Sequence, residues 1–231
     1  MRASTKDVQA ALEVMKKRLL EADLLDDWNP SVVEKTYDRG VRRVTWATNG
    51  VRPELVDLSL SNVREYLQFL NGRHYQFKLT DGSLIQVSYD IHESSSEVRQ
   101  SRLVWYPCPV SFKPEEIQEF PLSELILSSP TELLNLQAPM RIDYAPSQVA
   151  DNHSTTHMHL GREEFRLPVQ RPLEPNRFLR LIIRTIYPSI WEQTNIFRAV
   201  EDWTGAEGLN GDDKLCGSLS WQLPIQVPRT A

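Results

Sequence analysis

The chain has 231 residues, and a chain of this length can bury one substantial hydrophobic core without disulfides or metal ions to stabilise it. Its hydrophobic fraction of 40% is that of an ordinary globular protein, and no run approaches the roughly eighteen apolar residues that a membrane span needs. The net charge of −5 argues against a dominant non-specific attraction to nucleic acid, although local basic stripes still act at short range.

The N-terminal part of the chain is predicted to be helical. Apolar residues recur at helical spacing over Val8–Leu19, behind a Ser-Thr pair that can cap the first turn, and Asn-Pro at 29–30 closes this segment. Ser-Val-Val-Glu at 31–34 has the pattern of a capping box and predicts a second short helix. We therefore expect a helical extension over about residues 1–40, followed by a strand near 41–47.

A helix and an antiparallel meander are predicted next. Apolar residues over 61–70 share one helical face, and Asn-Gly at 71–72 stops the helix. Alternating residues over 75–79 lead through a Thr-Asp-Gly-Ser turn into a second run over 84–89, which predicts a hairpin. A third strand is expected over 102–106, where the following prolines end it.

The rest of the chain is predicted to mix short strands and helices. In chain order we expect short helices and turns over 114–130, strands over 141–144 and 155–160, helices over 175–187 and 189–203, a loop over 205–217 and a strand over 219–223. Residues 1–231 are thus expected to form a single α+β domain, with an antiparallel sheet of about five to seven strands and with N-terminal and C-terminal helices packed on one face.

The compartment is predicted from the N-terminus and the cysteines. The first residues open into a polar, amphipathic helix and lack the apolar core of a secretory signal. Cys108 and Cys216 form no CxxC pair, so reduced thiols are expected. We expect a cytoplasmic protein with no membrane partner.

Four stretches resemble a bacterial family known as domain of unknown function 2290. They are Asp-Gly-Ser-Leu-Ile-Gln-Val-Ser-Tyr at 81–89, Arg-Leu-Val-Trp-Tyr-Pro-Cys-Pro at 102–109, His-Met-His-Leu-Gly at 157–161, and the segment from Arg-Leu-Pro-Val-Gln-Arg-Pro to Arg-Thr-Ile-Tyr at 166–187. The resemblance covers most of the chain. It implies a bacterial cytoplasmic protein carried in mobile or defence gene neighbourhoods.

A histidine-rich segment is the principal candidate site. Three of the five histidines, His153, His157 and His159, fall within seven residues, shortly after Arg141 and Asp143. In extended backbone all five of these residues share odd parity and can therefore lie on one face. In a nuclease interpretation, the histidines and Asp143 supply acid–base catalysis near pH 7, while arginines neutralise the scissile phosphate.

Two other interpretations of this segment remain open. His157-x-His159 with Glu163 imitates the core of a cupin metal motif, but its flanking glycines and downstream histidine are missing, so we assign no metal and no cofactor. Alternatively, the histidines are structural groups that cap strand ends and organise the loop over 145–152.

A second candidate site is a stripe of arginines. Arg177, Arg180 and Arg184 are spaced three and four residues apart, so they project from one side of the predicted helix. Between 165 and 190 the only acidic residue is Glu174, which leaves this segment basic in an acidic chain. Arginine forks suit phosphate, although a solvated helix face is the commoner reason for such a stripe.

These patterns lead to two hypotheses for function. In the first, the chain is a conflict or phage-defence protein that recognises a phosphate-bearing ligand, RNA or DNA, on a surface made by the histidine strand and the arginine helix. Arg141, Arg166 and the helix arginines would contact phosphate, and histidine-based phosphodiesterase or ribonuclease activity stays open. In the second, it is a non-enzymatic subunit that docks on a neighbour-encoded protein.

Overall fold

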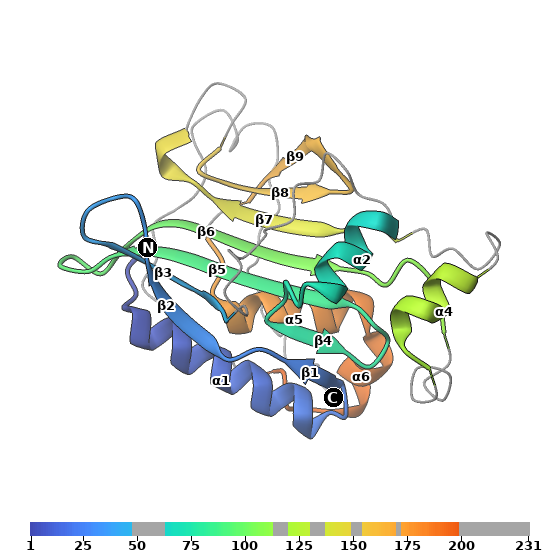
Figure 1. The fold of residues 1–231 in the computed structure, drawn as a ribbon. Helices are drawn as coiled ribbons and strands as arrows, with labels where there is room; N and C mark the ends of the chain where they lie inside the picture. Colours follow the sequence, from blue (N-terminus) through green and yellow to red (C-terminus); the bar gives the residue numbers. More distant parts are fainter. Residues whose placement is uncertain (48–62, 113–119, 130–136, 149–153, 170–171, 199–231) are drawn as a thin grey trace, which may run out of the picture.

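The computed structural model describes residues 1–47, 63–112, 120–129, 137–148, 154–169 and 172–198, and its architecture is α+β (Figure 1). These described segments contain nine β-strands, which all belong to one sheet in which every pairing is antiparallel. The predicted α+β class and antiparallel sheet are confirmed, and the sheet is larger than the expected five to seven strands.

The helices and strands follow one another closely along the chain. The helices are α1 (Thr5–Glu21), α2 (Val63–Asn71), α4 (Leu122–Ser128), α5 (Pro175–Ile186) and α6 (Pro188–Gln193), with a short 3₁₀ helix η3 (Pro146–Gln148). The strands are β1 (Leu25–Trp28), β2 (Ser31–Lys35), β3 (Val41–Trp46), β4 (Phe77–Leu79), β5 (Leu84–His92), β6 (Glu97–Tyr106), β7 (Met140–Tyr144), β8 (Thr156–Leu160) and β9 (Arg162–Pro168).

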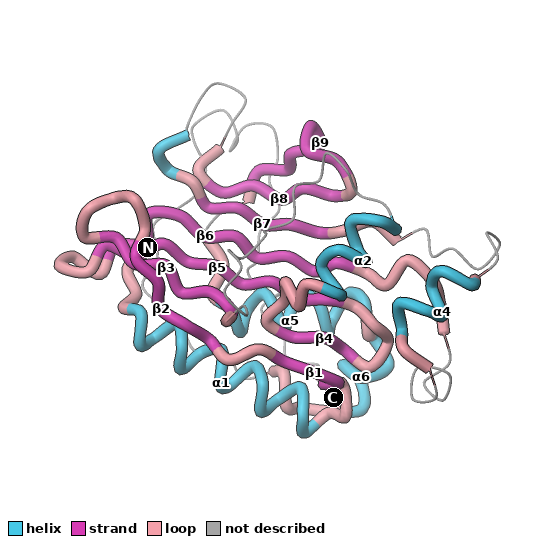
Figure 2. The backbone as a smooth tube through the Cα atoms, viewed as in Figure 1, coloured by secondary structure: helices cyan, strands magenta, loops and turns pink. Residues whose placement is uncertain are grey.

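The long strands β5 and β6 form the centre of the sheet (Figure 2). On the far side of β6 the sheet continues through β7 and β8 to β9. The other edge of β5 pairs with β4 near its beginning and with β3 near its end. Strands β1 and β2 extend these two short neighbours outward.

Helix α1 begins at the Ser4 cap that its sequence predicts, and the structure shows that this cap is a full capping box. The Ser4 hydroxyl accepts a hydrogen bond from the Asp7 amide at 3.2 Å, and the Ser4 amide donates to the Asp7 carboxylate at 2.7 Å. The expected apolar stripe is the buried face of the helix, formed by Val8, Ala11, Leu12, Met15 and Leu19.

The predicted helical extension over residues 1–40 is wrong beyond Glu21. The segment that was expected to form a second short helix is strand β2, which pairs with β3 from Ser31 opposite Trp46 to Lys35 opposite Arg42. Two adjacent valines favour extended backbone, and the capping-box pattern at 31–34 carries no information about strand pairing, so the tertiary context decided the conformation.

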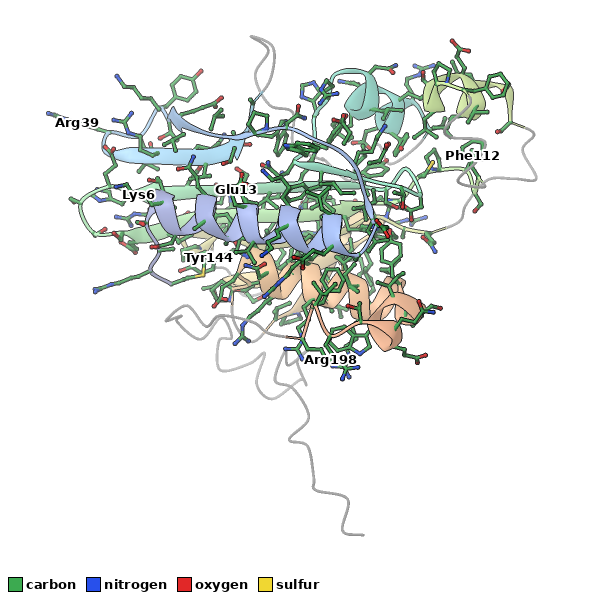
Figure 3. All side chains as sticks on the ribbon, turned by 90° about the horizontal axis from the view of Figure 1, so that it is seen from below. Lys6, Glu13, Arg39, Phe112, Tyr144 and Arg198 are labelled. Atoms are coloured by element: carbon green, nitrogen blue, oxygen red, sulfur yellow. The ribbon has the colours of Figure 1, made fainter. Side chains whose placement is uncertain are left out.

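Helices lie against both faces of the sheet, because side chains alternate along each strand. On one face, Ile85, Trp105 and Ile142 belong to the larger core, which the buried sides of α1 and α5 complete. On the other face, Leu84 and Val104 belong to a smaller core beneath α2 and α4. Figure 3 shows the sheet nearly edge-on, with α2 and α4 on one side and α5 and α6 on the other.

The end of the chain follows its prediction in part. Helix α5 begins at Pro175 as expected, whereas α6 ends at Gln193 in place of the predicted 203. The expected loop over 205–217 and strand over 219–223 lie outside the described residues.

Cys108 is buried with a free thiol whose pKa burial raises to about 11, and Cys216 is not among the residues described. No described helix has both the length and the apolar character needed to cross a membrane.

Candidate functional site

The sheet face under α2 and α4 becomes polar towards β7, β8 and β9. The pairing register places two rows of side chains on it, namely Val104–Arg141–His159–Arg166 and Arg102–Asp143–His157–Pro168. Residues directly opposite one another in antiparallel strands point to the same face and lie close together. Most of these polar side chains, together with Glu163, form a compact group that we call the histidine cluster: Arg102, Arg141, Asp143, His157, His159 and Glu163.

Asp143 stands at the centre of the histidine cluster. Arg102 donates from Nε to Asp143 Oδ1 at 3.0 Å and from Nη2 to Oδ2 at 3.4 Å. Arg141 places its Nε 2.9 Å from the same Oδ2. The Arg141 and Asp143 side chains are only 2% and 6% exposed, so this is a buried carboxylate between two guanidinium groups. Such an arrangement is costly to break, because either partner left alone would be a buried charge.

Both histidines direct a ring nitrogen at Asp143. The Nε2 atom lies 4.0 Å from Asp143 Oδ2 in His157 and 3.7 Å in His159, and the two rings meet edge to face. His157 Nδ1 lies 3.1 Å from the carbonyl oxygen of Ser154. A carbonyl can only accept, so Nδ1 carries the hydrogen and the lone pair of the neutral ring is on Nε2, facing the carboxylate.

The histidine cluster approaches solvent at β9. Glu163 Oε1 accepts a hydrogen bond from Arg141 Nη2 at 2.7 Å and lies 4.0 Å from His159 Nε2. Arg166 is 3.7 Å from the same carboxylate, and both side chains are about one-third exposed. Burial would raise the pKa of Glu163, but the hydrogen bond and charge of Arg141 outweigh it and lower that pKa.

His159 is neutral at physiological pH. Burial first, and the neighbouring Arg141 charge second, lower its pKa to about 4. Neither of its ring nitrogens has a hydrogen-bond partner within the described structure, and the side chain is fully buried. His159 therefore offers a lone pair to a cation rather than a proton to a substrate near pH 7.

The predicted shared face of the histidine segment is confirmed for four of its five residues, and Arg166 joins it. The expectation that the histidine strand forms a ligand-recognising surface, and hence a solvent-accessible face, is wrong for Asp143, His157 and His159, whose residues are 4%, 2% and 0% exposed. Strand parity determines which face a side chain occupies, but says nothing about what covers that face. His153 lies outside the described residues.

The histidine strand and the arginine helix do not form a common surface. Helix α5 packs with α1 on the opposite face of the sheet, where Ile142 and Met158 alternate with the residues of the histidine cluster. The sequence places both groups near one another along the chain, but a strand exposes successive residues to opposite sides. The single ligand surface predicted from the sequence is therefore replaced by two separate sites.

The second site surrounds Trp191 on α6. Arg180 and Arg198 place their guanidinium carbons 5.4 and 5.6 Å from the centre of the Trp191 ring. Burial lowers the pKa of Arg180, and so do the charges of Arg184, Arg177 and Arg198, in that order. We call this group the arginine surface: Arg177, Arg180, Arg184, Arg198 and Trp191. Arg198 is labelled in Figure 3, beside α6.

Three members of the two sites were missed by sequence reasoning. Arg102 reaches Asp143 from the neighbouring strand β6, and its even residue number gave no hint, because parity compares residues within one strand only. Arg198 and Trp191 join the arginine surface through the fold of α5 against α6. For these two residues the sequence offered one signal, namely that Arg198 and Trp191 both fall within the helix predicted over 189–203.

The comparisons agree with the resemblance seen in the sequence. The chain matches the family described as "Uncharacterized conserved protein (DUF2290)" over residues 24–216, a span that includes the histidine cluster and the arginine surface. No curated protein and no solved structure matches the chain.

Proposed function

We propose that this chain, which belongs to the DUF2290 family, binds single-stranded RNA or DNA through the arginine surface. The observation that carries the proposal is that the guanidinium groups of Arg180 and Arg198 lie close to the Trp191 ring, while the charges of Arg184 and Arg177 act on Arg180. On this proposal the protein acts as a nucleic-acid-binding component of bacterial conflict or defence, in keeping with the defence gene neighbourhood that the family resemblance implies.

The charge balance of this region favours an anionic ligand. Between 174 and 198 the chain has four arginines and only two acidic residues, Glu174 and Glu192, within a protein of net charge −5. Arg177 Nε lies 3.8 Å from the Glu174 carboxylate. Burial first, and then the like charges of Arg184, Arg177 and Arg198, lower the pKa of Arg180, so these guanidinium groups repel one another. A phosphate backbone relieves that repulsion and supplies acceptors for the guanidinium donors.

Trp191 favours single strands over duplex. Stacking of an unpaired base on an aromatic ring contributes about 1–3 kcal/mol to the binding free energy, and arginines over the ring add cation–π attraction. The guanidinium groups of Arg180 and Arg198 lie close to this ring, so a base stacked on Trp191 would have cationic donors near its phosphates.

The proposal is confined to binding, because the histidine cluster is poorly placed for cleaving a polymer. Asp143, His157 and His159 are almost fully buried, so a scissile phosphate on the exterior would not reach them. With a pKa of about 4, His159 is also a weak base and is not protonated at pH 7.

Salt dependence of binding tests the proposal. If Arg177, Arg180 and Arg184 contact phosphates, the logarithm of affinity for a single strand falls with the logarithm of salt by about 0.7 per contact. Replacing all three by alanine should therefore flatten the slope by about two. The measurement is a fluorescence-anisotropy titration of single-stranded RNA and DNA at several salt concentrations.

A matched variant separates specific contacts from lost net charge. Arg39, Arg64 and Arg99 are exposed arginines far along the chain from the arginine surface, and replacing them by alanine removes the same charge. That variant should keep the wild-type slope. Equal slopes for wild type and the α5 triple variant would contradict the proposal. So would absence of binding by wild type at about 50 mM salt, where phosphate contacts are strong, and a protein-docking role would then be favoured.

A further inference from the structure

We propose that Asp143, His157 and His159 form a binding site for one divalent transition-metal ion. The inference is independent of nucleic-acid binding, since these side chains lie on the sheet face opposite α5. Two imidazoles and one carboxylate form the donor set, which suits Zn²⁺, Fe²⁺, Mn²⁺ or Co²⁺ rather than Mg²⁺ or Ca²⁺, whose ligands are oxygens.

The distances between the donor atoms are close to those of a metal site. One ligand atom from each of the three residues lies within 4.8 Å of the other two. Metal–ligand bonds of about 2.0–2.2 Å require ligand atoms roughly 3–3.5 Å apart. The two Nε2 atoms are 3.7 and 4.0 Å from Asp143 Oδ2, so an ion would draw these side chains inward by less than about 1 Å.

The hydrogen bonding of the two histidines fits the ligation of an ion. His157 donates from Nδ1 to the Ser154 carbonyl, which orients Nε2 towards Asp143, as an outer hydrogen bond does in known metal sites. His159 is fully buried and neither ring nitrogen has a hydrogen-bond partner in the described part of the chain. A buried polar group without a partner is costly, and an ion at Nε2 satisfies it.

Sequence reasoning assigned no metal because the cupin-like pattern lacks its further histidine. The missing ligand comes instead from β7, where Asp143 is directly opposite His157 in the register. Glu163 adds a fourth donor near the site: its Oε1 is 4.0 Å from His159 Nε2, and its buried Oε2 has no hydrogen-bond partner among described groups.

The charge balance of the site indicates which form of the ion it would hold. The charges of Arg102 and Arg141 balance those of Asp143 and Glu163, so a divalent ion adds two positive charges to a buried site. Such a site prefers an ion that arrives with an anionic ligand. We therefore expect inorganic phosphate, which is much smaller than a polymer backbone, to tighten metal binding by entering from the partly exposed side of the cluster at Arg166.

Metal binding by the untagged full chain tests the inference. Protein treated with chelator is dialysed against Zn²⁺, Mn²⁺ or Co²⁺, with and without inorganic phosphate, and bound metal is measured by plasma emission. Wild type should hold one ion per chain and melt several degrees higher than without metal. His159→Gln and His157→Gln should each weaken binding at least tenfold. His92→Gln, a change on β5 away from the cluster, should bind as wild type does.

A spectroscopic readout on the unmodified protein covers the case in which a variant does not fold. Pulsed electron paramagnetic resonance of bound Mn²⁺ should show couplings to imidazole nitrogen. The inference is overturned if wild type binds no ion under these conditions, if the bound ion lacks nitrogen couplings, or if folded His159→Gln binds as tightly as wild type. None of these results would alter the salt dependence of nucleic-acid binding, so the two proposals fail separately.

Discussion

Replacing Asp143 by alanine should lower the free energy of unfolding by about 3–5 kcal/mol, as for a buried ion pair that loses one partner. The change removes the Asp143 carboxylate from Arg141, whose side chain is only 2% exposed, and removes both hydrogen bonds that Arg102 makes to that carboxylate. Glu163 still accepts from Arg141, but one carboxylate then faces two buried or half-buried guanidinium groups. Equilibrium unfolding in urea, with chelator present, measures the effect.

Glu93→Gln is the control for this experiment. Glu93 pairs with Arg42 Nε at 2.8 Å, a distance as short as those of the histidine cluster, but the Glu93 side chain is half exposed. An exposed ion pair contributes at most about 1 kcal/mol, so this variant should unfold nearly as wild type does. If Asp143→Ala costs no more than Glu93→Gln, Asp143 is not the buried centre of an ionic network.

Acid should destabilise the wild-type protein through His159 more than it destabilises His159→Gln. The pKa of His159 falls from 6.5 to about 4 on folding, because the ring is buried beside Arg141. Between these two pH values His159 is protonated in the unfolded chain but stays neutral in the folded protein. Stability is therefore full above pH 6.5 and is lost as the pH falls towards 4, by up to about 3 kcal/mol.

The measurement compares unfolding free energies of the two proteins at intervals from pH 7.5 to about pH 4, the interval that brackets both pKa values. Other carboxylates and histidines titrate in both, so the difference between the curves isolates His159, apart from its contacts with Asp143, Glu163 and His157. Wild type should lose more stability than His159→Gln as the pH falls, because only wild type loses this contribution. Parallel curves would mean that His159 titrates normally in the folded protein.

Much of the fold could be predicted from local sequence signals. The Ser-Thr cap at residues 4–5, the hairpin turn at Gly82 and the proline at the start of α5 each act over a few residues, and the structure places an element boundary at each. The wrong and missed elements, β1, β2 and β9, are strands near or at the margins of the sheet. Strand β1 depends on β4, which lies far along the chain, whereas β2 and β9 pair with their sequence neighbours β3 and β8 across short turns that the sequence patterns did not reveal.

The candidate sites also have features that local sequence patterns predict and features that depend on tertiary packing. Parity within a strand places Arg141 with Asp143 on β7 and His157 with His159 on β8, because the side-chain period of a strand is fixed, and the β7–β8 register brings the two pairs together. The register that adds Arg102 from β6, and the burial of the whole cluster, depend on tertiary packing. The stripe of arginines on α5 follows from helical spacing, whereas its separation from the histidines follows from which face of the sheet α5 covers.

Photo-crosslinking of single-stranded nucleic acid, followed by mass spectrometry of the crosslinked peptides, tests the central claim most directly. Wild-type protein bound to a photoreactive single-stranded RNA or DNA should yield crosslinks on peptides from residues 175–198, with Trp191 among the modified residues. Arg177→Ala/Arg180→Ala/Arg184→Ala should lose them. Crosslinks confined to peptides of β7, β8 and β9, or equal yields from wild type and this variant, would contradict an arginine surface that binds nucleic acid.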